Sequence, residues 1–126
     1  MDQVKVLLLQ NSSDYFIGKI TELDEEPMFL FDKCYKIVEC AEYGEDPESL
    51  ERRAYAFEGN HHKVSARKVD EGATEKDWYV YEYVVLQKFP KYTTQREIFL
   101  TSDAVATILD PEDAILALYK KSLETE

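Results

Sequence analysis

The sequence predicts a mainly β protein: a small, strongly bent, five-stranded antiparallel barrel with a C-terminal helix. Short apolar segments recur between turn-forming residues, which is typical of antiparallel strands. The segment 98–108 consists of two apolar runs joined by a polar hinge, and 111–124 has helical periodicity. With 126 residues, one domain covering 1–126 is the default expectation.

Three strands open the chain. Val4–Gln10 and Tyr15–Leu23 flank four turn-forming residues, which predict a hairpin loop. Gly18, in the middle of the second strand, indicates a bulge or a tight curvature where another backbone comes close. Asp24–Pro27 forms the next turn, because proline cannot donate to a sheet, and Met28–Cys40 follows as the third strand.

A charged insertion, 42–77, separates the third strand from the fourth, because charges of both signs replace long apolar runs there. Asp46 before Pro47 predicts a helix start, and 54–57 with 64–69 predicts a hairpin. The insertion carries either a basic patch or a solvated surface of mixed charge, and we favour the second because acids surround each basic group. These basic residues are Arg52, Arg53, Lys63, Arg67 and Lys68.

Two strands and a helix complete the prediction. Trp78–Phe89 is apolar or aromatic on both faces, so both faces are expected to be buried. Glu97–Ile108 bends at its hinge, Thr101–Asp103, as a strand does at the closing corner of a small barrel. Asp110 is the expected cap of the helix 111–124, which presents one apolar stripe and is expected to cover an open barrel end. The stripe consists of Ile115, Leu116, Leu118, Tyr119 and Leu123.

The formal net charge of −11 argues against non-specific binding to nucleic acid or to an anionic membrane, although a local basic patch is compatible with it. Cys34 and Cys40 on one strand would lie roughly 20 Å apart, too far for a disulfide. Free thiols fit a reducing compartment, and the apolar run Val6–Leu9 is too short for a signal peptide or a membrane span. We therefore expect a cytoplasmic protein.

A bent five-stranded barrel is compatible with OB-like, SH3-like or Sm-like folds. The residues resemble the Sm-like (LSm) family, particularly small Sm-like proteins of phage and cyanophage origin. The first family motif matches the first two strands, with Gly18 central, and the turn that follows Asp24. The second matches Phe99–Val105. The resemblance implies an SH3-like barrel over about two thirds of the chain, with 42–77 left out.

The same resemblance implies RNA as a partner, and it places a ligand site on two loops. Asp24 matches the family motif, whereas Met28 stands where the family has its first RNA-contacting Asn. Thr101 and Ser102 stand at the Arg-Gly position, with Asp103 beside them. Neither Thr101 nor Ser102 has the cationic plane that stacks on a base. The resemblance therefore implies an RNA site altered from the family pattern, or a phage structural or host-interaction protein that lost it.

The family assembles as rings of about five to seven subunits, so a homo-oligomer is expected. The long aromatic strand Trp78–Phe89 would be an aggregation-prone edge unless another strand covers it. We prefer a buried sheet face or a subunit contact for its tyrosine row over base stacking. The expected interface residues are Tyr79, Tyr81, Tyr83, Val85, Ile98, Leu100 and Val105.

No catalytic residue, metal site or cofactor is predicted, and we do not expect an enzyme. His61 and His62 are interpreted as exposed loop residues, because no further ligands stand at a zinc spacing. Asp24–Glu26 is interpreted as a solvated turn. Ser12, Ser13 and Ser102 lack the strand–turn–helix context of a nucleophilic serine.

Overall fold

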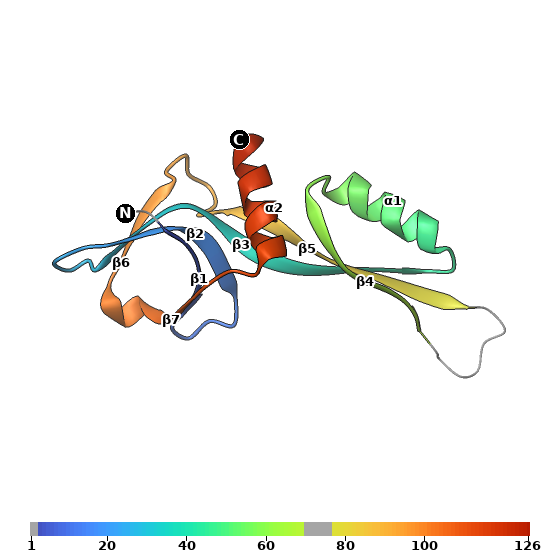
Figure 1. The fold of residues 1–126 in the computed structure, drawn as a ribbon, viewed down its shortest axis with the longest axis horizontal. Helices are drawn as coiled ribbons and strands as arrows, with labels where there is room; N and C mark the ends of the chain where they lie inside the picture. The colour runs from blue at the N-terminus through green and yellow to red at the C-terminus, as the bar shows by residue number, and fades with distance from the viewer. Residues whose placement is uncertain (1–2, 70–76) are drawn as a thin grey trace. The chain divides into compact units, whose positions relative to one another are not determined.

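The computed structural model describes residues 3–69 and 77–126, and within them the chain is mainly β. Figure 1 shows the elements in chain order. They are β1 (Gln3–Leu9), β2 (Tyr15–Glu22), β3 (Phe29–Gly44), α1 (Pro47–Phe57), β4 (His61–Val69), β5 (Trp78–Phe89), β6 (Glu97–Leu100), the 3₁₀ turn η1 (Ser102–Ala104), β7 (Val105–Leu109) and α2 (Asp113–Glu124).

The chain divides into two compact units. Unit 1 comprises Met1–Ile37 with Leu86–Glu126, and unit 2 comprises Val38–Val85. The expected insertion 42–77 contributes α1 and β4 to unit 2, and its residues 70–76 lie outside the described residues. The described part has seven strands rather than five, because the insertion supplies β4 and the bent strand is divided into β6 and β7.

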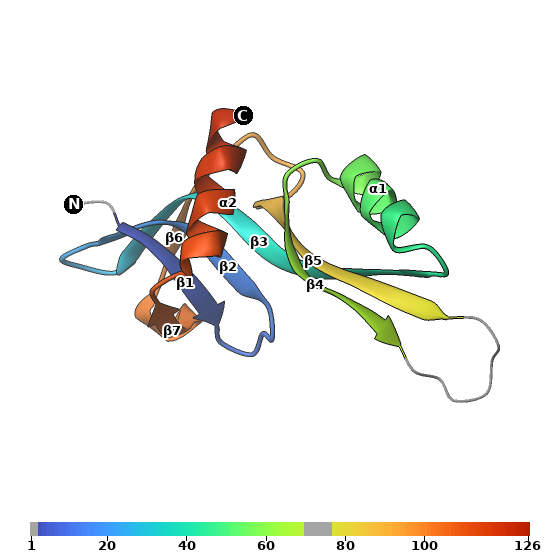
Figure 2. The same cartoon turned by 45° about the vertical axis from the view of Figure 1, so that its right-hand side comes forward.

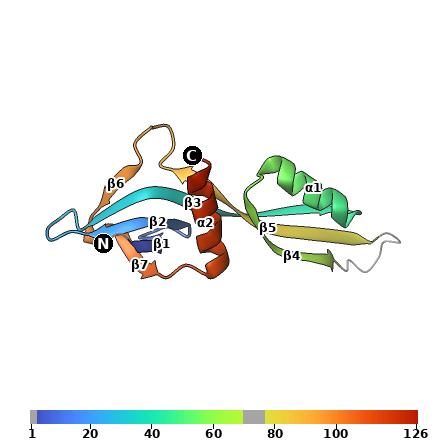
Figure 3. The same cartoon turned by 45° about the horizontal axis from the view of Figure 1, so that its top comes forward.

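The strands of unit 1 form a curled antiparallel half-barrel. β1, β2 and β3 make a meander, β6 pairs with the start of β3, and β7 pairs with β1. Figure 3 shows these strands curving around a common interior. The predicted corner is confirmed: η1 replaces the hinge, and the two halves of the bent segment pair with different strands.

A bulge between β2 and β3 produces part of this curl. The register jumps from Ile17 opposite Tyr35 to Lys19 opposite Asp32, and Lys33 adopts a left-handed backbone with φ 51°. A Cβ on Gly18 would lie 2.6 Å from Cε2 of Phe31. The prediction that Gly18 marks a bulge and a close approach is therefore confirmed.

Unit 1 buries apolar side chains on both faces of its sheet. The concave interior contains Leu7, Phe16, Ile20, Phe31 and Cys34, with residues of β6 and β7 packed against them. The other face packs against α2 through Val6, Ile17, Tyr35, Leu86, Leu118 and Tyr119. Ile115 and Leu123 also pack there, so the predicted apolar stripe of the C-terminal helix is confirmed.

The start of α2 differs from the prediction. The helix begins at Asp113, its N-cap is Glu112, and no side chain caps it. Asp110, the expected cap, forms an ion pair with Lys5 of β1. A tertiary ion pair has therefore replaced the local capping interaction.

Unit 2 is a three-stranded sheet portion with one helix on one face, as Figure 2 shows. The Asp46 carboxylate accepts from Glu48 N and caps α1, which confirms the helix start at Pro47. α1 buries Leu50 and Ala54 against the sheet. The predicted hairpin was wrong: 54–57 ends α1, and β4 instead pairs with β5.

None of the described helices is long and apolar enough to cross a membrane. Cys34 and Cys40 both lie on β3 as free thiols, as the spacing predicts.

Candidate functional site

The two loops that the Sm resemblance selects lie together in unit 1. Both oxygens of the Glu26 carboxylate accept from Ser102 N, at 3.3 and 3.2 Å. The adjoining strands are in register, with Phe29 opposite Leu100. We call residues 23–28 and 101–104 the loop pair. Asp24, Met28, Thr101, Ser102 and Asp103 all belong to it.

The loop pair is acidic and exposed. Its four carboxylates are Asp24, Glu25, Glu26 and Asp103, and neither loop contains Lys, Arg or His. Carboxylates repel the phosphates that an Arg would attract, and they accept hydrogen bonds from donors. Among the described residues no group of three His, Cys, Asp or Glu side chains could hold a metal ion. The exposed carboxylates of the loop pair therefore favour hydrogen-bond donors or positively charged groups over a polyanion.

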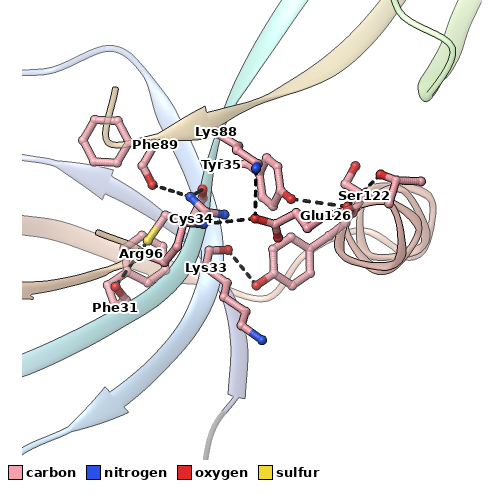
Figure 4. Close-up of polar contacts among 11 residues, drawn as sticks. Phe31, Lys33, Cys34, Tyr35, Lys88, Phe89, Arg96, Ser122 and Glu126 are labelled. Atoms are coloured by element: carbon pink, nitrogen blue, oxygen red, sulfur yellow. Dashed lines mark hydrogen bonds and ion pairs between the residues drawn. The ribbon is translucent and has the colours of Figure 1, made fainter. Parts of the chain in front are cut away.

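The bulge on β3 is held by side chains from distant parts of unit 1, drawn in Figure 4. The Tyr119 hydroxyl donates to Lys33 O at 2.8 Å. Nη1 of Arg96 donates to Cys34 O at 3.2 Å and to Phe89 O at 3.0 Å. Two of these acceptors, Lys33 O and Cys34 O, belong to the residues that the irregular register leaves without a partner on β2. Arg96 and Tyr119 therefore position the curl that carries the first loop.

Arg96 also lies in a charged and aromatic environment. Its guanidinium lies 5.2 Å from the centroid of the Tyr35 ring, and its Nε is 3.1 Å from Oε1 of Glu126. Lys88 Nζ lies 3.5 Å from the same carboxylate oxygen. Burial alone would raise the pKa of Glu126, but the Tyr35 hydroxyl and the two cations outweigh it, so the pKa is lowered.

Three groups near the bulge are held in their neutral forms. Burial raises the pKa of the Cys34 thiol to about 12, against the opposing charge of Arg96. Burial also raises the pKa of Tyr35 and of Tyr119. A protonated, buried thiol is a poor nucleophile, so Cys34 is a packing residue here.

We expected a strand of a neighbouring subunit to cover the edge of Trp78–Phe89, but β4 of the same chain covers most of it. β5 lies between β4 and β3 in the sheet, and β4 pairs with it from Trp78 to Val85. Within the chain, Tyr81, Tyr83 and Val85 are buried against α1, and Tyr79 packs beside them. The insertion supplies the covering strand, so this part of the interface prediction loses its premise.

The other three predicted interface residues face inward. Ile98, Leu100 and Val105 pack against the concave core of unit 1. Their strands expose the alternate residues instead: Phe99 is 57% exposed and Ile108 is 40% exposed. Because side chains alternate between faces along a strand, the three predicted residues lie on the core side of β6 and β7, and their neighbours lie on the exposed side.

The histidine interpretation also needs correction. His61 and His62 lie on β4 and are half-buried rather than in an exposed loop. Nδ1 of His61 contacts Glu58 O at 2.9 Å, and Nε2 contacts the Tyr81 hydroxyl at 3.0 Å. Both ring nitrogens are therefore used within unit 2.

Sequence reasoning missed two residues that organise the site. Glu26 was seen only as part of a solvated turn, although its carboxylate joins the two loops. Arg96 carried no sequence signal, since its acceptors, Cys34 O and Phe89 O, are backbone atoms.

Comparison with known proteins gives one family match. Residues 64–124 match a family model described as "Family of unknown function (DUF6561)". Neither the curated proteins nor the solved structures contain a match. The matched range includes Arg96, η1 and Tyr119, so the similarity covers residues that hold the bulge as well as the second loop.

Proposed function

We propose that the protein is a non-enzymatic, Sm-like binding or assembly module that associates into a homo-oligomeric ring. The carrying observation is the strand order of unit 1, β6-β3-β2-β1-β7, with a 3₁₀ turn between β6 and β7. Five antiparallel strands with a sharp corner in the last segment are what the Sm resemblance implies for an SH3-like barrel. The family relationship itself remains part of the proposal.

The edges of β6 and β7 support self-association. Among the described residues, β6 pairs only with β3, and β7 ends the strand order after β1. Each strand therefore presents unpaired backbone groups along one edge, next to exposed Phe99 or Ile108. In the proposed ring, β6 of one copy pairs with β7 of the next, a heterologous contact that closes on itself.

Because the loop pair is negatively charged, we favour a ring that binds no RNA at the loops where Sm-like proteins bind it. Its four carboxylates, Asp24, Glu25, Glu26 and Asp103, would face the phosphates of any RNA bound there. An altered RNA site at this position is therefore the less favoured form of the proposal. The negative charge of these loops, together with the resemblance to phage proteins, favours a structural or host-interaction role for the ring.

Size-exclusion chromatography with light scattering tests the ring on the full chain. We expect a mass of about five to seven protomers at micromolar concentration, and a strict monomer would contradict the proposal. Phe99→Glu should lower the mass because it places a charge at the proposed contact. Val64→Glu is the matched control, because Val64 is also 57% exposed but lies in unit 2. Equal masses for the two variants would show that β6 does not form the interface.

Fluorescence anisotropy with oligo-uridine at two salt concentrations tests the RNA clause. We expect no binding at tens of micromolar RNA in low salt, since the loops lack cations. Salt-dependent binding that Glu26→Gln strengthens would instead restore the loop pair as an RNA site.

A further inference from the structure

A pocket in unit 1 has the opposite charge to the loop pair. It lies where the segment between β5 and β6 meets the end of α2, and its volume is about 580 Å³. The polar residues that line it are Lys88, Lys91, Thr93, Thr94, Arg96 and Glu126. We call it the basic pocket. Three cations and one carboxylate give it a net charge of about +2, in a chain whose formal net charge is −11.

The donors of the basic pocket are of the kinds that bind oxyanions. Lysine ammonium and arginine guanidinium groups form charge-assisted hydrogen bonds with phosphoryl oxygens, and threonine hydroxyls add neutral donors. The Thr93 hydroxyl oxygen accepts from Gln95 N at 3.1 Å, which leaves its proton available for donation. These lysine and threonine groups are the donors that the pocket offers to an external anion.

A carboxylate of the chain already occupies part of this pocket. Oε1 of Glu126 lies 3.1 Å from Nε of Arg96 and 3.5 Å from Nζ of Lys88. It thus stands where two cations converge, as an oxygen of a bound oxyanion would. Lys91 has no such partner among the described residues, so one cation of the pocket is left for an external anion. The pair with Lys88 is weak, because that side chain is 60% exposed.

We propose that the basic pocket binds the phosphoryl group of a small molecule, and that the Glu126 carboxylate competes with this ligand for Arg96 and Lys88. The ligand's oxygens take the place of the Glu126 oxygen and reach Lys91 and the threonine hydroxyls as well. Tyr92 and Pro90 stand beside these donors, so an organic group attached to the phosphate has an apolar surface to contact. A pocket of this size accommodates such a molecule, since ligand sites span about 300–1,000 Å³.

Isothermal titration calorimetry on the full chain in low salt tests this proposal, with inorganic phosphate and phenyl phosphate as the two probes. Equal affinities identify the free ion as the ligand, and tighter binding of phenyl phosphate identifies an organic monoester. Absence of heat for both probes at tens of millimolar would overturn the proposal.

Three variants locate the binding. Lys91→Gln should weaken it about fivefold or more, because it removes a direct charge, whereas Lys120→Gln on α2 should change it less than about twofold. Glu126→Gln should strengthen it about threefold or more, because the internal competitor becomes neutral. An equal loss of affinity for the two lysine variants would show a general charge effect and overturn the proposal. Weaker binding by Glu126→Gln would overturn the competition.

Discussion

The loop pair and the basic pocket are two regions of the same unit with opposite charge. The loop pair occupies the motif positions of the Sm resemblance and carries four carboxylates. The basic pocket occupies no motif position and carries Lys88, Lys91 and Arg96. The difference teaches that a motif can locate loops in space without carrying the family's chemistry. The positive charge and the free donors of the basic pocket make it the place that we propose for an anion.

Both regions depend on the bulge between β2 and β3. The first loop joins these two strands, and Arg96 reaches from the basic pocket to Cys34 O at the bulge.

Gly18→Ala should cause the largest loss. Its Cβ would meet Phe31 Cε2 at 2.6 Å and Asp32 O at 3.0 Å, and Phe31 is only 1% exposed. We expect a destabilisation of about 2–3 kcal/mol in urea unfolding, because buried overpacking strains the core. Gly59→Ala is the control, since nothing lies within 4 Å of its Cβ position. Similar losses of stability in the two variants would show that the close approach of Phe31 to Gly18 is not the cause.

Arg96→Lys should cause the second largest loss of stability, because it keeps the charge but loses the planar group that spans two carbonyls. A lysine cannot bond Cys34 O and Phe89 O with the same geometry, so we expect a loss of about 2 kcal/mol. Phosphate binding should fall in the same variant, while the loop pair keeps its Glu26–Ser102 contact. A variant as stable as the wild type would show that Arg96 does not hold the bulge.

Tyr119→Phe should cost about 1 kcal/mol, since it removes only the hydroxyl that donates to Lys33 O. Tyr92→Phe is the matched control, because Tyr92 is fully exposed and should change stability by less than about 0.5 kcal/mol. Thermal unfolding of both variants measures the difference. No difference between them would contradict a role for Tyr119 at the bulge.

Glu126→Gln should have the smallest effect, under about 1 kcal/mol at neutral pH. The pKa of Glu126 is lowered in the folded protein, so its contribution is present above the ordinary value of 4.5 and disappears as the pH falls through the folded pKa. Unfolding at pH 7 and pH 3 should show the wild type and the variant converging in acid. A gap that widens in acid would contradict the ion pair with Arg96.

Local signals in the sequence predicted much of unit 1. Gly18 predicted the bulge, the polar hinge predicted the corner at η1, and apolar spacing predicted the stripe of α2. These features depend on neighbours along the chain, which patterns can reveal.

Contacts between distant residues could not be predicted in this way. Asp110 forms an ion pair with Lys5 in place of capping the helix. β4 covers the edge of β5 that was expected to pair with another subunit. Glu26 and Arg96 act on backbone atoms of remote segments, and the sequence contains no pattern for such partners. For the same reason, the pocket formed where 88–96 meets Glu126 became visible only in three dimensions.

One measurement tests the central contrast between the two regions most directly: the backbone amide spectrum of the full chain titrated with inorganic phosphate. The account predicts saturable shifts at Thr93 and Thr94 of the basic pocket, with Thr101 and Ser102 of the loop pair unchanged. Saturable shifts at Thr101 and Ser102, with Thr93 and Thr94 unchanged, would contradict it.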